Sequence, residues 1–269
     1  MLYGVFFGTV VVAASFSWPV AWIGLELNLI AFIPVAISNN HNKKGAITYF
    51  VSQSCGSLII LMGGMLADSS FFSVSLLLIG VVFKIGLMPL HFWVPCVVMT
   101  LSRFNLYLLM SWQKIGPIVI VLTSSVGYAL LCTVNAVGGA LAMSGVSVLP
   151  LLLIFRGIVQ IGWVLMTTGI FTFYYLFVYY IVLSAVVLYR AVASIQFGWA
   201  LLNAGGLPPF SGFIIKLKAI LHIKGSIVVL LLGASGLALS SYIRLLLNTR
   251  LKSGPRTGFL VVTLAAGRV

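Results

Sequence analysis

The sequence predicts an all-α polytopic membrane protein with ten or eleven transmembrane helices. Of its 269 residues, 62% are hydrophobic and only 6% are charged, and the mean hydropathy is +1.22. A water-soluble domain could not cover its surface with so few polar side chains. Apolar runs of about 20 residues, the length that crosses a hydrocarbon core, follow one another along almost the whole chain. We therefore expect one transmembrane domain over residues 1–269.

Ten apolar runs, taken in chain order, give the expected spans. The loops between them are short, as is usual when helices pack in one bundle. The tail Gly258–Gly267 is apolar but too short to cross alone, so it is either a stunted eleventh helix or a surface segment. The runs lie at about 2–17, 19–38, 46–67, 71–88, 103–126, 128–145, 148–170, 172–190, 195–223 and 225–249.

Charge is unevenly distributed, with 15 basic residues against two acidic ones and a net charge of +13. The basic residues are scattered singly and form no face that could track a phosphate backbone, which excludes nucleic acid as a partner. The positive-inside bias explains the excess and predicts that even-numbered spans end, and the N-terminus begins, on the inner side, the matrix in a mitochondrion. Inner loops carry Lys43, Lys44, Arg103, Arg190, Arg250, Lys252 and Arg256, whereas the other side offers mainly Asp68 and Lys224.

Two segments join a lysine to a glycine and proline break. They are Lys84–Pro89 and Asn203–Phe213, the second followed by Lys216. Such breaks free backbone groups that lipid cannot satisfy, so they should be buried against protein or water. Corresponding broken helices in two halves of one chain are typical of an antiporter-like inverted-repeat transporter with its ion path at the breaks. We expect repeats at about 19–126 and 128–249, followed by a tail at 250–269.

Glu26 is the only acid inside an apolar run, in the middle of the second span. A buried carboxylate needs a cation or stays protonated, and Lys84 on a neighbouring span is its natural partner. A Glu–Lys pair whose proton occupancy depends on neighbouring charge could relay protons. Alternatively, the pair is static and only fixes helix packing.

Three further ionisable residues could extend such a path. Lys114 has about ten apolar-run residues on either side of it, which makes snorkelling to the interface difficult. His91 follows Pro89 and could hand protons between Lys84 and Lys114, or it is an interfacial residue. Lys216 follows the second break and should point at water or a polar path. For Arg156, inside the seventh span, function and local packing remain equal alternatives.

Several kinds of chemistry have no signature in the chain. Cys55, Cys96 and Cys132 are widely spaced and form no metal or haem pattern, so they are expected to be small buried residues. No phosphate-binding glycine-rich loop and no nucleophile with a base is found, and no metal site is expected. The chain alone is therefore not expected to carry out redox or hydrolytic chemistry.

Five segments in order resemble the signature segments of the mitochondrial NADH dehydrogenase subunit 2 family, an antiporter-like family of the membrane arm of respiratory complex I. They span most of the chain, from Trp22 to Arg244, and their order makes the resemblance specific. The segments are WIGLELNLIAFIP, FKIGLMPLHFWVP, WQKIGP, GGLPPFSGFIIK and SSYIR.

The resemblance implies proton translocation along a polar axis at mid-membrane, formed here by Glu26, Lys84, Lys114 and Lys216. It also implies that the chain holds no cofactor of its own, with NADH, FMN, iron–sulfur clusters and ubiquinone in other subunits. The implied partners are other membrane-arm subunits and phospholipids such as cardiolipin, in the mitochondrial inner membrane. Metazoan members resemble an eleven-helix bundle, which agrees with an N-terminus on the inner side.

The chain departs from the family pattern at three places. Cys96 stands where a glutamate is common, and residues 44–50 lack a glutamate and a lysine of a motif at the third span. A basic pair near the seventh span is reduced to Arg156. These departures affect the proton access route rather than the central axis. Two alternatives stay open, a cation/proton antiporter subunit of the Mrp type and a structural spacer of the membrane arm.

Overall fold

A computed structural model describes residues 2–37, 43–66, 71–123, 129–167, 169–189, 195–208, 210–223, 225 and 227–252. All regular elements within these ranges are helices, which agrees with the predicted all-α class. In chain order they are α1 (Leu2–Ala14), α2 (Trp18–Ile37), α3 (Lys44–Met65), α4 (Phe71–Ile85), α5 (Trp93–Val98), α6 (Arg103–Met110), the 3₁₀ turn η1 (Trp112–Lys114), α7 (Ile115–Thr123), α8 (Ala129–Ser144), α9 (Leu149–Met166), α10 (Ile170–Tyr189), α11 (Ile195–Gly205), α12 (Ser211–His222) and α13 (Ile227–Lys252).

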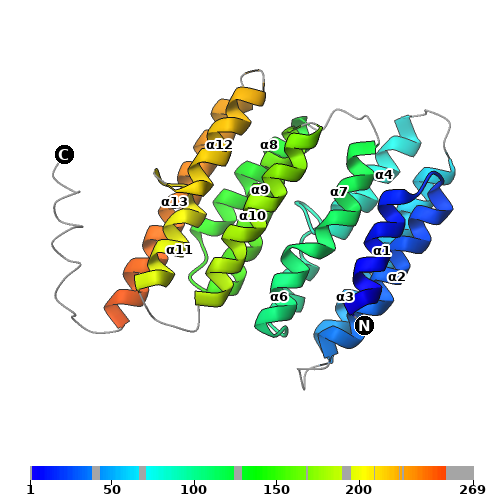
Figure 1. The fold of residues 1–269 in the computed structure, drawn as a ribbon, viewed down its shortest axis with the longest axis horizontal. Helices are drawn as coiled ribbons and strands as arrows, with labels where there is room; N and C mark the ends of the chain where they lie inside the picture. The colour runs from blue at the N-terminus through cyan, green and yellow to red at the C-terminus, as the bar shows by residue number, and fades with distance from the viewer. Residues whose placement is uncertain are drawn as a thin grey trace.

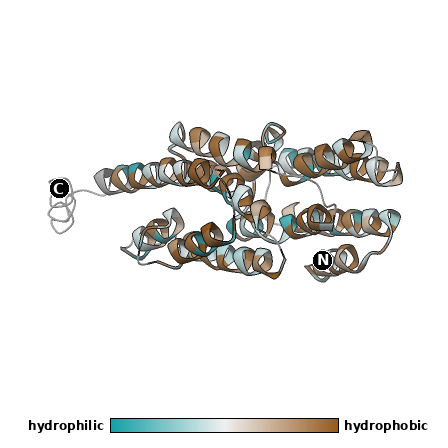
Figure 2. Ribbon diagram, turned by 90° about the horizontal axis from the view of Figure 1, so that it is seen from above, coloured by the Kyte–Doolittle hydropathy of each residue, from teal (hydrophilic) through white to brown (hydrophobic). Residues whose placement is uncertain are grey.

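The helices form two neighbouring groups along the long axis of the molecule (Figure 1). Helices α1–α4, α6 and α7 make up one group, and α8–α13 make up the other. Seen from above, the helices lie in two rows (Figure 2). Contacts of α5 with α9 and of α6 with α10 join the two groups. The segment around Lys114 therefore lies where the groups meet.

Apolar side chains cover the outside of the bundle, and polar side chains lie inside it. Large residues such as Tyr3, Phe71, Ile170 and Leu221 are among the most exposed. Three lysines and one arginine are buried instead: Lys84, Lys114, Lys216 and Arg156. A soluble protein has the opposite arrangement, so this distribution indicates a bundle whose surface faces lipid.

Within the described ranges, six helical stretches are long and apolar enough to cross a membrane. They are Trp18–Ile37, Lys44–Met65, Arg103–Thr123, Leu149–Met166, Ile170–Tyr189 and Ile227–Asn248. Helices α1, α4 and α8 are apolar but shorter, and the predicted 195–223 span consists of two short helices. The predicted count of ten or eleven spans is therefore not confirmed. The tail 258–267 lies outside the described residues, as do Asp68, Arg190, Lys224 and Arg256.

Both predicted breaks are present, and they have the same backbone structure. Helix α4 is followed by Gly86 with φ +74°, and α11 by Gly206 with φ +80°. In each case the glycine N–H donates to the carbonyl three residues earlier, at 3.2 and 3.1 Å. The N–H of the next residue, Leu87 or Leu207, donates to the carbonyl five residues earlier, at 2.9 and 3.4 Å. This is the Schellman arrangement, which needs the left-handed conformation that glycine adopts readily.

A third interruption was not predicted. The expected run 103–126 is a single membrane-length stretch, but its α-helix stops at Met110 and resumes at Ile115 after the η1 turn. Pro117 has no N–H to donate to the carbonyl four residues earlier, that of Gln113, so the α-helical ladder cannot run through this turn. Lys114 consequently lies at a helix interruption. Lys84 and Lys216 likewise lie beside the breaks at Gly86 and Gly206.

Candidate functional site

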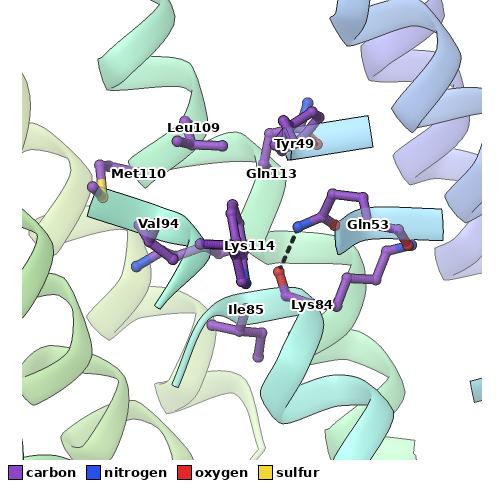
Figure 3. Close-up of a pocket in the computed structure, with 10 residues that line it drawn as sticks. Tyr49, Gln53, Lys84, Ile85, Val94, Leu109, Met110, Gln113 and Lys114 are labelled. Atoms are coloured by element: carbon purple, nitrogen blue, oxygen red, sulfur yellow. Dashed lines mark hydrogen bonds between the residues drawn. The ribbon is translucent and has the colours of Figure 1, made fainter. Parts of the chain in front are cut away.

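Lys84 and Lys114 line the same cavity, although they come from different helices. The cavity has room for roughly one water molecule. Figure 3 shows Lys84 on the last turn of α4 and Lys114 on the η1 turn. The side chain of Gln53, on α3, extends toward Lys84, and a dashed line marks their hydrogen bond. The remaining lining residues are Tyr49, Ile85, Trp93, Val94, Leu109, Met110 and Gln113. Two of the predicted proton-carrying residues are thus brought to one small, partly polar space.

Lys84 is tied to α3 by two hydrogen bonds with one residue. Its Nζ donates to the backbone carbonyl of Gln53 at 3.4 Å, and the Gln53 Nε2 donates to the Lys84 carbonyl at 3.0 Å. The carbonyl is one of those that the end of α4 leaves unpaired. Gly80 of α4 keeps the two helices close enough for this exchange, since a Cβ there would lie 2.9 Å from the backbone nitrogen of Ile60 on α3.

Glu26 is half-buried on α2 and accepts a hydrogen bond from the Ser57 hydroxyl of α3. It interacts electrostatically with Lys84, the partner that the sequence suggested. The two side chains do not form a direct ion pair within 4.0 Å. Ser57 therefore orients the carboxylate, and Lys84 is its neighbouring cation at longer range.

A chain of hydrogen bonds leads away from the first cavity toward α2. The Tyr49 hydroxyl donates to Gln113 Oε1 at 3.2 Å, and Gln113 Nε2 donates to Asn28 Oδ1 at 3.0 Å. Tyr49 and Asn28 are both buried. Amide and hydroxyl groups that are buried and satisfied in this way hold neighbouring side chains in fixed positions. These residues were not predicted from the sequence, although amide side chains inside apolar runs were a visible signal.

The ammonium group of Lys114 lies against α9 of the second helix group. A Cβ placed on Gly157 would lie 2.9 Å from Lys114 Nζ and 3.3 Å from the Tyr179 hydroxyl. The absence of a side chain at Gly157 thus makes room for the ammonium group beside Tyr179. The Arg156 guanidinium lies over the ring of the same tyrosine, 5.4 Å from its centroid.

A second small cavity lies in the second helix group. It is comparable in size to the first, and Arg156, Gln160, Tyr175 and Tyr179 provide its polar groups. The Tyr175 hydroxyl donates to Gln160 Oε1 at 2.7 Å. Val178, Val182, Ala204, Gly212 and Ile215 complete the lining, so α9, α10 and both halves of the broken α11–α12 helix contribute to it.

Lys216 reaches back from α12 to the second break. Its Nζ donates to the Gly205 carbonyl at 3.3 Å, one of the groups that the end of α11 leaves unpaired. Asn203 Oδ1 accepts from the Gly212 N–H at 2.9 Å and so satisfies a donor at the start of α12. Lys216 is buried and is within electrostatic range of Arg156. The break thus holds the end of this lysine, whose neighbour Ile215 lines the second cavity.

Asn135 of α8 has a similar role at the first break. Its Oδ1 accepts from the Met88 N–H at 2.7 Å, and its Nδ2 donates to the Leu131 carbonyl at 2.7 Å. The indole of Trp93 bridges the same break by donating to the Phe83 carbonyl at 2.9 Å. Each break therefore uses one asparagine to satisfy a freed backbone N–H, as burial in a membrane requires.

His91 does not line the cavity that Lys84 and Lys114 share. Its ring contacts that of Phe155 edge-on, with centroids 5.8 Å apart. Its Nδ1 is buried and has no hydrogen-bond partner among the described residues. Whether His91 hands protons between the two lysines remains a prediction.

The described cysteines are unpaired, with Cys55 and Cys96 exposed and Cys132 buried. Cys132 has the buried setting that was expected, and the other two do not. Among the described residues no three His, Cys, Asp or Glu side chains gather as metal ligands. The polar groups of both cavities are instead amides, hydroxyls and cations.

The chain is similar to curated proteins named NADH-ubiquinone oxidoreductase chain 2. The protein from Aquarana catesbeiana is 30% identical over 93% of this chain and 85% of its own length. The protein from Pongo abelii is 31% identical over 79% of this chain and 72% of its own length, and that from Lumbricus terrestris is 27% identical over 90% and 83%. No protein-family model matches the sequence.

Solved structures share the fold at lower identity. A chain of respiratory complex I from Thermus thermophilus has a TM-score of 0.73 at 20% identity, over 91% of this chain and 68% of that one. A chain of the Mrp complex from Dietzia has a TM-score of 0.73 at 17% identity, over 90% and 58%. A chain of an archaeal membrane-bound sulfane sulfur reductase has a TM-score of 0.75 at 17% identity, over 97% and 69%.

Proposed function

Because the chain belongs to the NADH-ubiquinone oxidoreductase chain 2 family, we propose that it is a core membrane-arm subunit of respiratory complex I that translocates protons. The protons pass along Glu26, Lys84, Lys114 and Lys216 at mid-membrane. Electron transfer from NADH to ubiquinone in other subunits, which hold the FMN and iron–sulfur clusters, drives this movement. The chain itself contributes no redox site.

One observation carries this proposal. The three buried lysines lie beside the three helix interruptions. Lys84 and Lys114 line one water-sized cavity, and Ile215, the neighbour of Lys216, lines a second one. A buried lysine costs roughly 2.5–3.5 kcal/mol at the centre of a membrane helix, so three in one bundle require a use. Their number and their placement across both helix groups favour transfer over local packing.

The steps of transfer follow from the contacts. A lysine carries a proton as an ammonium group and becomes a neutral amine when it releases it. One water in the first cavity would link Lys84 to Lys114 by hydrogen bonds. Two ammonium groups around so small a space repel each other, so a proton arriving on one favours release from the other. Glu26 stabilises the charge on Lys84, and Lys114 passes protons toward Tyr179 and the second cavity.

The remaining assignments rest on the family and on the charge pattern. The partners are other membrane-arm subunits, with phospholipids such as cardiolipin at the lipid-facing surface, in the mitochondrial inner membrane. The N-terminus faces the matrix. The matching hydrogen bonds at Gly86 and Gly206 support inverted repeats at about 19–126 and 128–249. His91 serves as an accessory proton carrier near the first break.

Replacing Lys84 with methionine in the complex reconstituted into liposomes tests the proposal. The expected result is a lower number of protons moved per NADH, because methionine keeps the bulk but carries no proton. Lys44→Met removes an exposed lysine from the start of α3 and serves as the control with unchanged stoichiometry. An unchanged stoichiometry in Lys84→Met would favour the structural spacer and reject the proposal.

The similarity in fold to the Mrp complex favours a second candidate, a subunit of a monovalent cation/proton antiporter. The two candidates differ in what the chain assembles with. Purification of the chain in an assembly that oxidises NADH supports the complex I assignment. Sodium-dependent proton exchange by an assembly without NADH oxidation would support the antiporter.

A further inference from the structure

The guanidinium group of Arg156 is a buried charge that pairs with no carboxylate among the described residues. The residue is 3% exposed in the middle of α9. Its Nε and Nη1 have no hydrogen-bond partner among the described residues, and its guanidinium lies over the ring of Tyr179. Buried charges are normally paired and hydrogen-bonded, because leaving them unpaired costs several kcal/mol. Arg156 therefore needs a counter-charge.

The described part of the chain offers none. The whole sequence has two acidic residues, Glu26 and Asp68, and no described carboxylate lies within 4.0 Å of a cation. Glu26 belongs to the other helix group, where it is held by Ser57 beside Lys84. A lysine in this position could become neutral by releasing its proton, but an arginine remains charged at any physiological pH.

The cavity beside Arg156 presents hydrogen-bond donors. Arg156, whose Nε and Nη1 have no partner among the described residues, lines it together with Tyr179, whose hydroxyl also has none. The acceptor oxygen of Gln160 is already engaged by the Tyr175 hydroxyl. The N–H of Gly212, another lining residue, already donates to Asn203 Oδ1. A space lined by a cation and a free hydroxyl suits a negatively charged guest.

We propose that this cavity binds a single monatomic anion, a halide, as the counter-charge of Arg156. The ion accepts hydrogen bonds from Nε–H and Nη1–H of Arg156 and from the Tyr179 hydroxyl. The cavity has room for roughly one water molecule, so small side-chain movements admit a halide ion, whereas phosphate and the headgroup of a lipid are too large. Chloride is the halide available to a cell.

The position of this anion links it to two lysines. Tyr179 lies beside the ammonium of Lys114, and Lys216 is within electrostatic range of Arg156. A negative charge between them offsets the repulsion that Arg156 would otherwise exert on a proton in transit. Proton transfer between the two helix groups would accordingly depend on the anion.

Bromide provides a direct probe, because its anomalous scattering distinguishes it from water. Crystals of the complete respiratory complex grown with bromide in place of chloride should show an anomalous peak within hydrogen-bond distance of Arg156 Nε and Nη1. Absence of that peak at saturating bromide, or occupation of the cavity by water alone, overturns the proposal. The readout does not depend on whether this chain carries protons, so its failure leaves the proposed function untouched.

Three variants make the assignment specific. Arg156→Met should abolish the bromide peak, and the milder Tyr179→Phe should weaken bromide binding about tenfold, as loss of one charge-assisted hydrogen bond does. Lys218→Met is the matched control, because Lys218 also lies 5.4 Å from a tyrosine ring, that of Tyr174, but is exposed. It should retain the peak. A peak that persists in Arg156→Met, or unaltered binding in Tyr179→Phe, refutes the site.

Discussion

Gly157→Ala is the smallest change that should disturb proton transfer between the two helix groups. The new methyl carbon would lie 2.9 Å from Lys114 Nζ and 3.3 Å from the Tyr179 hydroxyl. Carbon and nitrogen atoms pack at about 3.5–4.0 Å, so the ammonium must retreat by roughly 0.6–1.1 Å. The far end of a lysine side chain moves easily, and the helix backbone can stay in place.

The size of the effect follows from this displacement. A misplacement of about 1 Å can reduce the rate of a step that needs precise geometry by about 100-fold. We therefore expect proton translocation by this subunit to slow between several-fold and 100-fold. The stability of the complex should hardly change, and alanine in a helix interior would even favour it by about 0.5–1 kcal/mol over glycine.

The assay is NADH-driven acidification of liposomes that contain the complex. Gly236→Ala is the control, since among the described residues no atom outside its own stretch of helix lies within 4 Å of the added methyl group. If Gly157→Ala acts through Lys114, it should have no further effect in a Lys114→Met background, as a double-mutant cycle would reveal. Normal proton translocation by Gly157→Ala, or an equal effect in both backgrounds, would refute this reasoning.

Two further changes test the helix breaks. Asn135→Leu removes the acceptor of the Met88 N–H and should lower the stability of the complex by about 1–3 kcal/mol, measured by thermal unfolding; an unaltered unfolding temperature would show that this bond is unimportant. Gly206→Ala forces alanine to φ +80° and places a methyl group 3.1 Å from Lys216 Nζ. It should cost about 1–2 kcal/mol and reduce proton translocation, and a complex as stable and active as the parent would count against the proposed break geometry.

The sequence was sufficient to predict the all-α class, the two glycine-containing breaks and the burial of Lys84 and Lys114. These features depend on local signals, namely the length of apolar runs, glycine and proline within them, and the cost of a charge in lipid. The interruption at Lys114 was missed although Pro117 signalled it. Pro117 indicates that the helix is disturbed nearby, but a proline alone does not show whether the helix bends or is interrupted.

The residues that shape the site could not be predicted because their roles arise from contacts between distant parts of the chain. Gln53 and Asn135 meet the first break from 31 and 47 residues away. Gly157 acquires its role only because the end of Lys114 occupies the space above it. For Arg156 the sequence did not distinguish a functional role from local packing. Only the three-dimensional arrangement revealed that its charge pairs with no carboxylate among the described residues.

Lys114→Arg provides the most direct test of the central claim, that the buried lysines carry protons and do not merely supply positive charge. Arginine keeps the charge but does not release its proton. We predict that the number of protons moved per NADH falls as far in Lys114→Arg as in Lys114→Met. If Lys114→Arg kept the full stoichiometry in an assembled complex, a structural charge would suffice at this position and the account would be contradicted.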